Sequence, residues 1–410
     1  MSKIEKLIKE LCPNGVTKYL IKDICNVTRG RIISKNELAY NAGNFPVYSS
    51  QTLNNGVFGK IDTFDFDGEY VQWTTDGANA GSIFYRNGKF SVTNVCGLLK
   101  VKDNYLNIIK TTYLAYVLTQ ETKKYVNYAT SNPKLMSNVM ERISVKIPPL
   151  EVQEEIVRIL DKFGELEAEL EAELEARKSQ YEFWRNKLFN LNYLSSKKEF
   201  VFKSIDEICD TVTDYVAAGS FKDLSNHVKY LKEPSFAMLI RTTDIKNKFK
   251  NKNFVYIDEK AFKYLWRVNL NYEAIIMPNI GNCGEIYYIT PELLPYKNNA
   301  LAPNAILLRS SYCNMKYLKY YFQSKDFQVN LKRITSPSGQ TKFNKTDLKK
   351  IVIPIISLKQ QERIVSILDK FDKLVNDISE GLPAEIEVRR KQYEYYRNKL
   401  LSFEELVVNE

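Results

Sequence analysis

Apolar residues recur at helical spacing in two segments of the chain, and the first segment predicts one long helix. Over residues 151–190 they lie three, four or seven residues apart, which places them on one stripe of a helix. At about 1.5 Å per residue this helix would be about 54 Å long. So long a single stripe needs a partner. The stripe consists of Ile156, Leu160, Phe163, Leu166, Leu170, Leu174, Tyr181, Trp184 and Leu188.

A second apolar stripe lies near the end of the chain and is the obvious partner. Gly381-Leu-Pro383 interrupts it, and because proline removes a helical hydrogen bond we expect a kink or a break there. The two stripes together predict a two-helix coiled coil. The second stripe consists of Ile364, Leu368, Phe371, Ile378, Leu382, Ile386, Tyr393, Tyr396 and Leu400.

The two helical segments are altered copies of one sequence. Residues 147–163 match residues 355–371, and residues 177–188 match residues 390–400. A repeat this long and this far apart predicts that the chain is built twice.

Between the helical segments, the pattern changes to short strands and turns. In the first half, strands are predicted at residues 44–48, 68–73, 82–85 and 97–101, and a helix near residues 113–118. The second half matches the first faintly but in the same order, for example Ser131–Leu135 with Gly339–Phe343. We therefore expect an α+β fold with two tandem, pseudo-repeated globular domains separated by two long helices. The predicted segments are residues 1–150 (domain 1), 151–195 (helical spacer), 196–357 (domain 2) and 358–410 (helical spacer).

Charge divides the chain along the same lines. Residues 151–188 carry −5 and residues 358–401 carry +1, so the remainder carries +14 of a chain whose net charge is +10. Basic residues concentrated outside the helices are typical of nucleic-acid binding. A lysine-rich composition without an anionic partner explains the charge equally well.

Cysteine and histidine offer little for metal or nucleophile chemistry. The six cysteines are scattered without a Cys-x-x-Cys pair, which indicates reduced core thiols. The single histidine, His227, is expected on the surface. No apolar run reaches the roughly 18–20 residues of a bilayer span, and the charged start lacks a signal-peptide core. We expect a cytoplasmic protein.

Taken together, these segments resemble the DNA-specificity subunit of type I restriction-modification systems across essentially the whole chain. The repeated helical segments carry the resemblance at Pro148–Phe163 and Gly381–Leu400. Trp73–Gly81, Thr213–Ser220 and Leu301–Ala305 look like target-recognition segments of the family.

The resemblance implies a division of labour. Each globular domain would be a target-recognition domain that contacts one half of a bipartite, asymmetric site in double-stranded DNA. The helices would pack antiparallel, set the half-site spacing and dock two methyltransferase (modification) subunits, with restriction subunits joining the complex. Partner subunits would bind S-adenosylmethionine, ATP and Mg, so we expect no cofactor, metal or catalytic residue on this chain.

The sequence agrees with a non-catalytic subunit. It lacks the [Asp/Asn]-Pro-Pro-[Tyr/Phe] loop with which amino-methyltransferases hold the target amine, and Ser131–Lys134 is the nearest approach. It also lacks a Gly-x-x-x-x-Gly-Lys-[Ser/Thr] P-loop.

Residues 165–176 are Glu-Leu-Glu-Ala three times over. One four-residue unit adds about 6 Å of helix, against about 3.4 Å per base pair along a DNA strand. One unit more or less should therefore change the half-site separation by roughly one to two base pairs. Phe163 to Tyr181 spans 18 residues and Phe371 to Tyr393 spans 22, so the spacer is asymmetric. Our hypothesis is that this segment sets spacing and not base identity.

Candidate DNA contacts are polar and aromatic residues in glycine-rich turns, because such side chains reach base edges and phosphates. In domain 1 they are Ser49, Ser50, Trp73, Thr74, Thr75, Asp76, Asn79, Arg86, Ser131, Asn132 and Lys134. In domain 2 they are Tyr215, Arg241, Thr242, Thr243, Asn279, Asn282, Ser338, Gln340 and Lys342. For each residue considered alone, an ordinary turn or core-edge position is the favoured interpretation, and we expect about half of the set to lie on the DNA face.

Glycines and aromatic residues near these segments have simpler interpretations. Gly77, Gly81, Gly281 and Gly284 predict tight turns, because they do not follow the strand-to-helix pattern of a nucleotide fold. Aromatic and arginine residues end both helices, and we expect them to pack helices or dock methyltransferase subunits. The docking candidates are Tyr181, Trp184, Arg185, Tyr393, Tyr396 and Arg397.

Two other functions stay open. A self-sufficient restriction or methylation enzyme with divergent motifs would methylate DNA without partners. A scaffold with two protein-binding domains would show no DNA affinity at any salt concentration. The target sequence itself cannot be read from the chain, because recognition depends on loop geometry.

Overall fold

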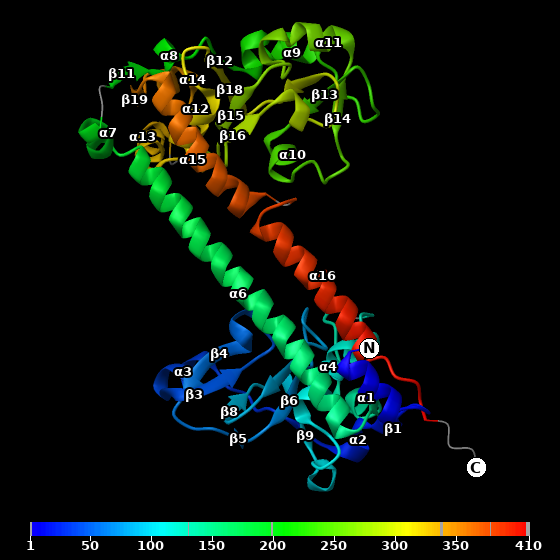
Figure 1. The fold of residues 1–410 in the computed structure, drawn as a ribbon. Coiled ribbons are helices and arrows are strands. Elements are labelled where there is room, and N and C mark those ends of the chain that lie inside the picture. Colours follow the sequence, from blue (N-terminus) through cyan, green and yellow to red (C-terminus); the bar gives the residue numbers. More distant parts are fainter. Residues whose placement is uncertain (1, 130, 198–199, 337–338, 378, 407–410) are drawn as a thin grey trace. The chain divides into compact units, whose positions relative to one another are not determined.

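The structure is a computed structural model that describes residues 2–129, 131–197, 200–336, 339–377 and 379–406 (Figure 1). The chain forms two compact units. Unit 1 comprises Met1–Glu171 together with Glu385–Glu410, and unit 2 comprises Ala172–Ala384. Unit 1 is therefore built from both ends of the chain.

Unit 1 contains three sheets. Their strand orders are β1-β10, β2-β9-β6-β7 and β4-β3-β8-β5. The strands are β1 (Thr17–Leu20), β2 (Cys25–Arg29), β3 (Ala42–Tyr48), β4 (Val57–Ile61), β5 (Phe66–Asp67), β6 (Tyr70–Thr74), β7 (Ile83–Arg86), β8 (Lys89–Val92), β9 (Cys96–Val101) and β10 (Ser144–Ile147).

Helices surround these sheets, and one of them continues out of unit 1. The helices are α1 (Lys3–Leu11), α2 (Ile21–Ile24), α3 (Lys35–Tyr40), η1 (Leu53–Gly56), η2 (Asp103–Tyr105), α4 (Thr111–Glu121), η3 (Thr122–Tyr125), α5 (Ser137–Met140), α6 (Leu150–Leu188) and α16 (Leu382–Leu400). α1 begins with a capping box between Ser2 and Glu5, which satisfies free amides of its first turn.

Unit 2 repeats this plan. Its sheets have the orders β11-β19, β12-β18-β15-β16 and β14-β13-β17. The strands are β11 (Val201–Ser204), β12 (Thr211–Asp214), β13 (Ala237–Ile240), β14 (Val255–Ile257), β15 (Ala274–Pro278), β16 (Tyr287–Ile289), β17 (Asn299–Leu301), β18 (Ala305–Arg309) and β19 (Val352–Ile355).

The helices of unit 2 follow in the same sequence order. They are α7 (Leu191–Lys197), α8 (Ile205–Ile208), η4 (Tyr215–Ala218), α9 (Phe221–His227), α10 (Thr242–Lys246), α11 (Glu259–Tyr264), η5 (Trp266–Val268), η6 (Pro291–Leu293), α12 (Met315–Phe322), α13 (Lys325–Ile334), α14 (Lys345–Lys349) and α15 (Leu358–Asn376). The equivalence of the four-stranded sheets confirms the predicted internal repeat.

The apolar strand patterns end in two buried cores. Every residue of β6 and of β15, which lie inside the equivalent four-stranded sheets, is buried. α4 and α12 pack beside them, with Tyr113 and Tyr317 fully buried at equivalent positions. The strands predicted near residues 44–48, 82–85 and 97–101 and the helix near 113–118 are present, with bounds shifted by a few residues.

A buried glutamine attaches each long helix to its domain. Gln153, fully buried near the start of α6, donates through Nε2 to the carbonyls of Ile108 and Pro148, both at 2.7 Å. Its Oε1 accepts from the Lys110 amide at 2.9 Å. Gln361 in α15 makes the equivalent link in unit 2, where it also bonds backbone groups of the domain.

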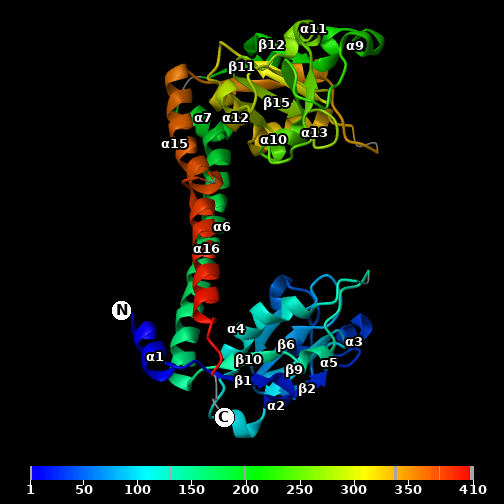
Figure 2. The same cartoon turned by 90° about the vertical axis from the view of Figure 1, so that its right-hand side faces the viewer.

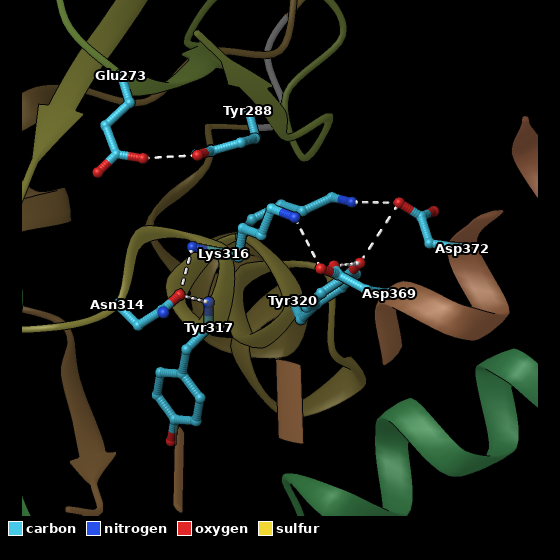
Figure 3. A network of polar contacts seen from close by, with 9 residues as sticks. Glu273, Tyr288, Asn314, Lys316, Tyr317, Tyr320, Asp369 and Asp372 are labelled. Carbon is cyan, nitrogen blue, oxygen red and sulfur yellow. Dashed lines mark hydrogen bonds and ion pairs between the residues drawn. The ribbon is translucent and has the colours of Figure 1, made fainter. Parts of the chain in front are cut away.

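A tyrosine–aspartate bond adds a second attachment. In unit 1, the Tyr116 hydroxyl donates to Asp161 at 2.6 Å. In unit 2, Tyr320 donates to Asp369 at 2.6 Å, and Lys316 pairs with the same carboxylate at 2.7 Å. Figure 3 shows these side chains of α12 turned toward Asp369 and Asp372 of α15. At this position unit 2 therefore adds an ion pair to the tyrosine–aspartate hydrogen bond.

Within unit 1, the first part of α6 pairs antiparallel with α16, and the two helices lie side by side in Figures 1 and 2. Phe163 stacks on Tyr396 with ring centroids 5.5 Å apart, and Arg390 pairs with Glu167 at 2.8 Å and with Glu171 at 3.3 Å. Higher residue numbers on α6 thus meet lower numbers on α16.

Within unit 2, the end of α6 pairs with α15 in the same way. Tyr181 stacks on Phe371 with centroids 6.3 Å apart. In the repeat, Tyr181 is equivalent to Tyr393, and Phe371 is equivalent to Phe163. The Tyr181–Phe371 contact of unit 2 is therefore the counterpart of the contact between Phe163 and Tyr393 in unit 1. This confirms two helices that pair antiparallel.

Two details of the helical prediction need comment. The break at Gly381–Pro383 is confirmed, because α15 ends at Asn376 and α16 begins at Leu382. Trp184 and Tyr396, at 40% and 42% exposed, lie partly outside the predicted stripes. The first stripe is also wrong at Leu166, which is 37% exposed; the neighbouring Glu167 faces α16 instead. Leucines at strict four-residue steps drift around a helix of 3.6 residues per turn, which accounts for the difference. Ile378 lies outside the described residues.

None of the helices in the described part of the chain combines the length and apolarity that a bilayer span requires.

Candidate nucleic-acid interface

In unit 1, two loops that are far apart in sequence are joined by backbone hydrogen bonds. The Gly77 amide donates to the Pro133 carbonyl at 3.0 Å, and the Leu135 amide donates to the Thr75 carbonyl at 2.8 Å. Asp76 and Lys134 form an isolated antiparallel bridge. We call residues 76–79 with 131–134 the paired loops of unit 1.

Unit 2 has the same construction. The Gly281 amide donates to the Thr341 carbonyl at 2.8 Å, the Phe343 amide donates to the Asn279 carbonyl at 3.1 Å, and Ile280 bridges Lys342. Residues 280–283 with 339–342 are the paired loops of unit 2, and Ser338 next to them lies outside the described residues. The match of Ser131–Leu135 with Gly339–Phe343 seen in the sequence is therefore an equivalence in space.

Most of the predicted contacts in the paired loops reach the surface. Ser131, Asn132 and Lys134 are exposed in unit 1, whereas Asp76 and Asn79 are half-buried. The Asp76 carboxylate lies between two cations, 3.7 Å from Arg29 and 3.8 Å from Lys134. In unit 2, the exposed residues are Asn282, Gln340 and Lys342.

Asn279 and the serines lie at the edges of these surfaces. Asn279 is half-buried, and its Oδ1 is a buried acceptor without a hydrogen-bond partner among the described residues. Ser49 and Ser50 are half-buried; the Ser49 hydroxyl accepts from Thr93 at 2.9 Å, and the Ser50 carbonyl accepts from Asn79 at 3.0 Å. These bonds bring residues 49–50 beside the paired loops of unit 1.

The glycines act as turns, as predicted. Gly77, Gly81, Gly281 and Gly284 all have positive φ, a conformation that glycine adopts without steric cost. At Gly81 a Cβ would also lie 2.7 Å from the Val126 side chain.

Three predicted contacts of domain 1 are core residues instead. Trp73, Thr74 and Thr75 are fully buried. Trp73 donates through Nε1 to the Leu135 carbonyl at 3.0 Å, and its ring lies against Gly97. Strand β6 continues to residue 74, and the burial of these three side chains argues against direct contact with DNA, so they are not carried into the proposed contacts. Through the bonds of Trp73 and Thr75 to Leu135, these residues support the paired loops of unit 1.

Arg86, another predicted contact, is also buried, at only 2% exposed. Its Nε donates to Gln72 Oε1 at 2.7 Å and its Nη2 donates to the Asn55 carbonyl at 2.9 Å. The guanidinium lies 3.6 Å from the centroid of the Tyr48 ring. Burial lowers the pKa of Arg86 to about 10, which leaves it charged at neutral pH.

Two predicted contacts of domain 2 are engaged internally. Tyr215 is 5% exposed, and its hydroxyl accepts from Tyr230 at 3.4 Å. Arg241 is half-buried and forms a two-pronged pair with Asp244, at 2.9 Å from Nε and 2.6 Å from Nη2. Beside it, Thr242 is half-buried and Thr243 is exposed at the start of α10.

The docking candidates divide in the same way. Tyr181 is 6% exposed and Tyr393 is half-buried, because both pack inside the helix pairs, with Arg185 and Arg397 over their rings. Trp184 is 40% exposed and Tyr396 is 42% exposed. Trp184 and Tyr396 therefore present the larger aromatic surfaces, whereas Tyr181 takes the helix-packing role, one of the two expected for these residues.

The sequence interpretation passed over several residues of these surfaces. Asn54 is exposed next to Asn55, whose carbonyl accepts from Arg86, and Lys246, Lys248 and Lys250 are exposed after Arg241. Arg29, from β2, reaches the paired loops by donating to Thr75 Oγ1 at 2.9 Å. Nothing in the sequence placed Ser50, whose carbonyl accepts from Asn79, beside the paired loops.

Known proteins resemble the chain over both halves. The family described as the type I restriction modification DNA specificity domain matches residues 13–176 and 186–388. A Mycoplasma pneumoniae protein named as type I specificity subunit S.MpnORF507P is 33% identical over 388 residues, covering 95% of this chain and 98% of its own. The MpnII type I restriction enzyme specificity subunit of the same organism is 46% identical over 42% of this chain and 52% of its own.

Solved structures establish the same fold. The S subunit of a type I restriction-modification system from M. genitalium has a TM-score of 0.55 and 17% identity, covering 94% of this chain and 96% of that one. A chain from a type I R-M system has a TM-score of 0.58 and 14% identity, covering 95% and 98%. With two matched domains in tandem and a relative that aligns from end to end, the chain belongs to the family of type I restriction-modification DNA-specificity subunits.

Proposed function

We propose that this chain gives a type I restriction-modification complex its DNA sequence specificity, each domain reading one half of a bipartite, asymmetric site. The observation that carries the proposal is the repetition of the paired loops. Both units build them on equivalent backbone hydrogen bonds but display different side chains, Ser131 and Asn132 against Gly339 and Gln340. Two domains that share a backbone arrangement but differ in their exposed side chains can read two different half-sites.

The proposed contacts are the reachable members of the predicted set. Amide and hydroxyl side chains can bond base edges, and lysine contacts phosphate or guanine. In unit 1 they are Ser49, Ser50, Asp76, Asn79, Ser131, Asn132 and Lys134. In unit 2 they are Thr242, Thr243, Asn279, Asn282, Gln340 and Lys342.

The charge distribution supports DNA as the ligand. The chain outside the long helices carries +14, and Lys134 and Lys342 occupy the same position in the two units. Affinity should then fall steeply as salt rises, because binding releases counterions from the phosphates. A scaffold that binds only proteins would lack this dependence.

We further propose that the helices dock two modification subunits and set the half-site spacing. Trp184 and Tyr396 support docking, because each leaves at least 40% of its surface exposed at equivalent positions of the repeat. In this arrangement the chain is a non-catalytic adaptor; the modification subunits supply S-adenosylmethionine-dependent adenine methylation, and restriction subunits supply ATP- and Mg-dependent cleavage.

Methylome sequencing of the host with and without the gene tests the proposal. We expect deletion to remove one bipartite N6-methyladenine motif, two short defined parts around an undefined gap. Reconstitution with the modification subunits and S-adenosylmethionine should restore that motif in vitro. Failure of the reconstituted complex to methylate any specific motif would contradict the proposal, and methylation by the purified chain alone would favour a self-sufficient enzyme.

A further inference from the structure

Left-handed backbone conformations gather in two short stretches of the chain. Five non-glycine residues of the described chain have positive φ: Asn54 and Asn55 at 49°, Lys248 at 50°, Phe249 at 56° and Asn304 at 70°. Residues with a side chain rarely adopt this region, because Cβ crowds the following carbonyl oxygen. Four of the five lie in two loops whose first residues are already among the proposed contacts, Ser49 and Ser50 in one loop and Thr242 and Thr243 in the other.

These two loops are equivalent in the repeat. Residues 49–56 connect β3 to β4, and residues 241–254 connect β13 to β14. β3 pairs antiparallel with β4 and parallel with β8, as β13 does with β14 and β17. We call them the first and the second connection. The same place in both domains therefore carries a left-handed turn, which asparagine tolerates in the first connection and which Lys248 and Phe249 do not favour by themselves in the second.

A buried arginine braces the first connection. Arg86 donates to the carbonyl of Asn55, the second left-handed residue, and to Gln72. Gln72 in turn donates through Nε2 to the Ser49 carbonyl at 3.5 Å, at the start of the connection. The guanidinium thus links both ends of the turn to β6.

An arginine–aspartate pair braces the second connection. Arg241 donates through Nη2 to the Asn253 carbonyl at 2.8 Å, near the end of the connection. Its partner Asp244 is 2% exposed, and the Asp244 carbonyl accepts from the left-handed Phe249 at 2.9 Å. Again an internal arginine ties the two ends together.

The tips of both connections are open to solvent beside the paired loops. Leu53 is 81% exposed, and the side-chain amides of Asn54 and Asn55 make no hydrogen bond within the described residues. In the second connection, Lys248 and Lys250 are exposed. Asn79 bonds the Ser50 carbonyl, and Lys246 pairs with Glu285, so each connection adjoins the turn next to its paired loops.

We propose that the tips of the two connections are base-reading elements of the two domains, and that Arg86 and Arg241 are positioning residues that hold them. This inference rests on the proposed function. An asparagine amide matches the major-groove edge of adenine, an apolar side chain matches the thymine methyl group, and lysine matches guanine acceptors. The first tip offers an asparagine amide and an apolar side chain, from Asn54 and Leu53. The second tip offers lysine, from Lys248 and Lys250.

Substitutions of exposed tip residues test whether the two tips read bases. Leu53→Ala and Asn54→Ala alter no buried group, so the reconstituted methyltransferase complex should assemble normally on a randomised DNA library. We expect discrimination of at least one base in one half-site to fall about tenfold, with the other half-site unchanged. Lys248→Ala should change only the other half-site. Tyr40→Ala is the matched control. Tyr40 is 88% exposed but lies before β3, whereas the first connection lies after β3.

A rescue experiment tests the brace. Arg86→Met removes both hydrogen bonds, and we expect altered base preference in the half-site that responds to Leu53→Ala. Adding Asn55→Gly should recover the preference, since glycine adopts positive φ without support. An effect of Arg86→Met that Asn55→Gly leaves unchanged would overturn the positioning role.

The outcomes separate this inference from the proposed function. If the unaltered chain directs no bipartite motif, the proposed function fails. If it directs one, and Leu53→Ala, Asn54→Ala and Lys248→Ala all leave both half-sites unchanged, only the base-reading role of the connections is overturned.

Discussion

At the residue scale, Gln153 and Gln361 join each long helix to a domain. Gln153 satisfies three backbone groups, and Gln361 accepts from the Asn314 amide at 2.9 Å and donates to the Ile356 carbonyl at 2.9 Å. Such buried backbone groups are costly to leave unpaired. The two glutamines therefore fix where the helices start. The amphipathic pattern of the two helices gives no sign of this role.

We predict that Gln153→Met destabilises unit 1 and that Gln361→Met destabilises unit 2, each by about 2 kcal/mol, the cost of orphaned buried groups. Hydrogen exchange followed by mass spectrometry would locate the lost protection in β10 and α4 for the first variant and in β19 and α12 for the second. The exposed Gln180→Met is the control, and equal loss of protection in both units would contradict the prediction.

A second residue-scale prediction concerns Glu155, which is 4% exposed. Hydrogen bonds from Arg158 at 2.6 Å and Lys3 at 2.9 Å lower its pKa to about 2. A lowered pKa means that the folded state favours the carboxylate, so its stabilisation is complete above the ordinary value near 4.5 and is lost as pH falls toward 2.

Urea unfolding at several pH values tests this sign. Glu155→Gln should be less stable than the unaltered chain at pH 7, and the difference should shrink steadily below about pH 4.5. A difference that grows on acidification would show that the carboxylate is not stabilised by its two cations.

At the element scale, the helix pairs combine aromatic packing with exposed charge. Phe163 stacks on Tyr396 and contacts Tyr393 in unit 1, and Tyr181 stacks on Phe371 in unit 2. The Arg390 pairs with Glu167 and Glu171 are solvent-accessible and contribute at most about 1 kcal/mol each. Glu167 and Glu171 belong to the Glu-Leu-Glu-Ala segment, whose side chains are mostly exposed, so packing places little constraint on the length of this segment.

Removing one Glu-Leu-Glu-Ala unit is predicted to shorten the gap of the methylated motif by roughly one to two base pairs, since four residues are about 6 Å of helix. The defined bases should stay the same, because the paired loops are untouched. Motif sequencing of the reconstituted complex measures both quantities. A changed half-site with an unchanged gap would refute the spacing role; substituting the unit's leucine by alanine, without changing length, is the control.

At the scale of the whole molecule, the end of the chain completes the first domain. Leu400, Leu401 and Phe403 are buried in the core that also holds Val16 and Tyr113. The Val16 amide donates to the Glu404 carbonyl at 3.0 Å, and Lys146 donates to the Phe403 carbonyl. Unit 1 thus depends on residues separated by nearly the full length of the chain.

We predict that Phe403→Ala destabilises unit 1 by about 3–5 kcal/mol, the range for truncating a buried phenylalanine to alanine. Hydrogen exchange should show the loss in β1 and β10 and leave β11 and β19 protected. Ser402→Ala, at an exposed neighbouring position, should behave like the unaltered chain. Undiminished protection of β1 would mean that the tail does not stabilise the domain.

The sequence by itself determined the repeat, the two long helices, the break at Gly381–Pro383 and most strands, because apolar periodicity and proline chemistry act locally. It also carried the family resemblance. Predicted domain boundaries and the DNA-contact set stay predictions. Glycine spacing likewise indicated the tight turns at residues 77 and 281, which positive φ explains.

Only the tertiary structure decided which polar residues face solvent. Trp73, Thr75, Arg86 and Tyr215 have side chains suited to DNA, but sheet packing and internal hydrogen bonds enclose them. The structure also joined residues 76–79 to 131–134, and Asn79 to Ser50, through bonds between distant segments. A linear pattern records the chemistry of each residue, whereas exposure and neighbourhood are set by long-range contacts that form only when the chain folds.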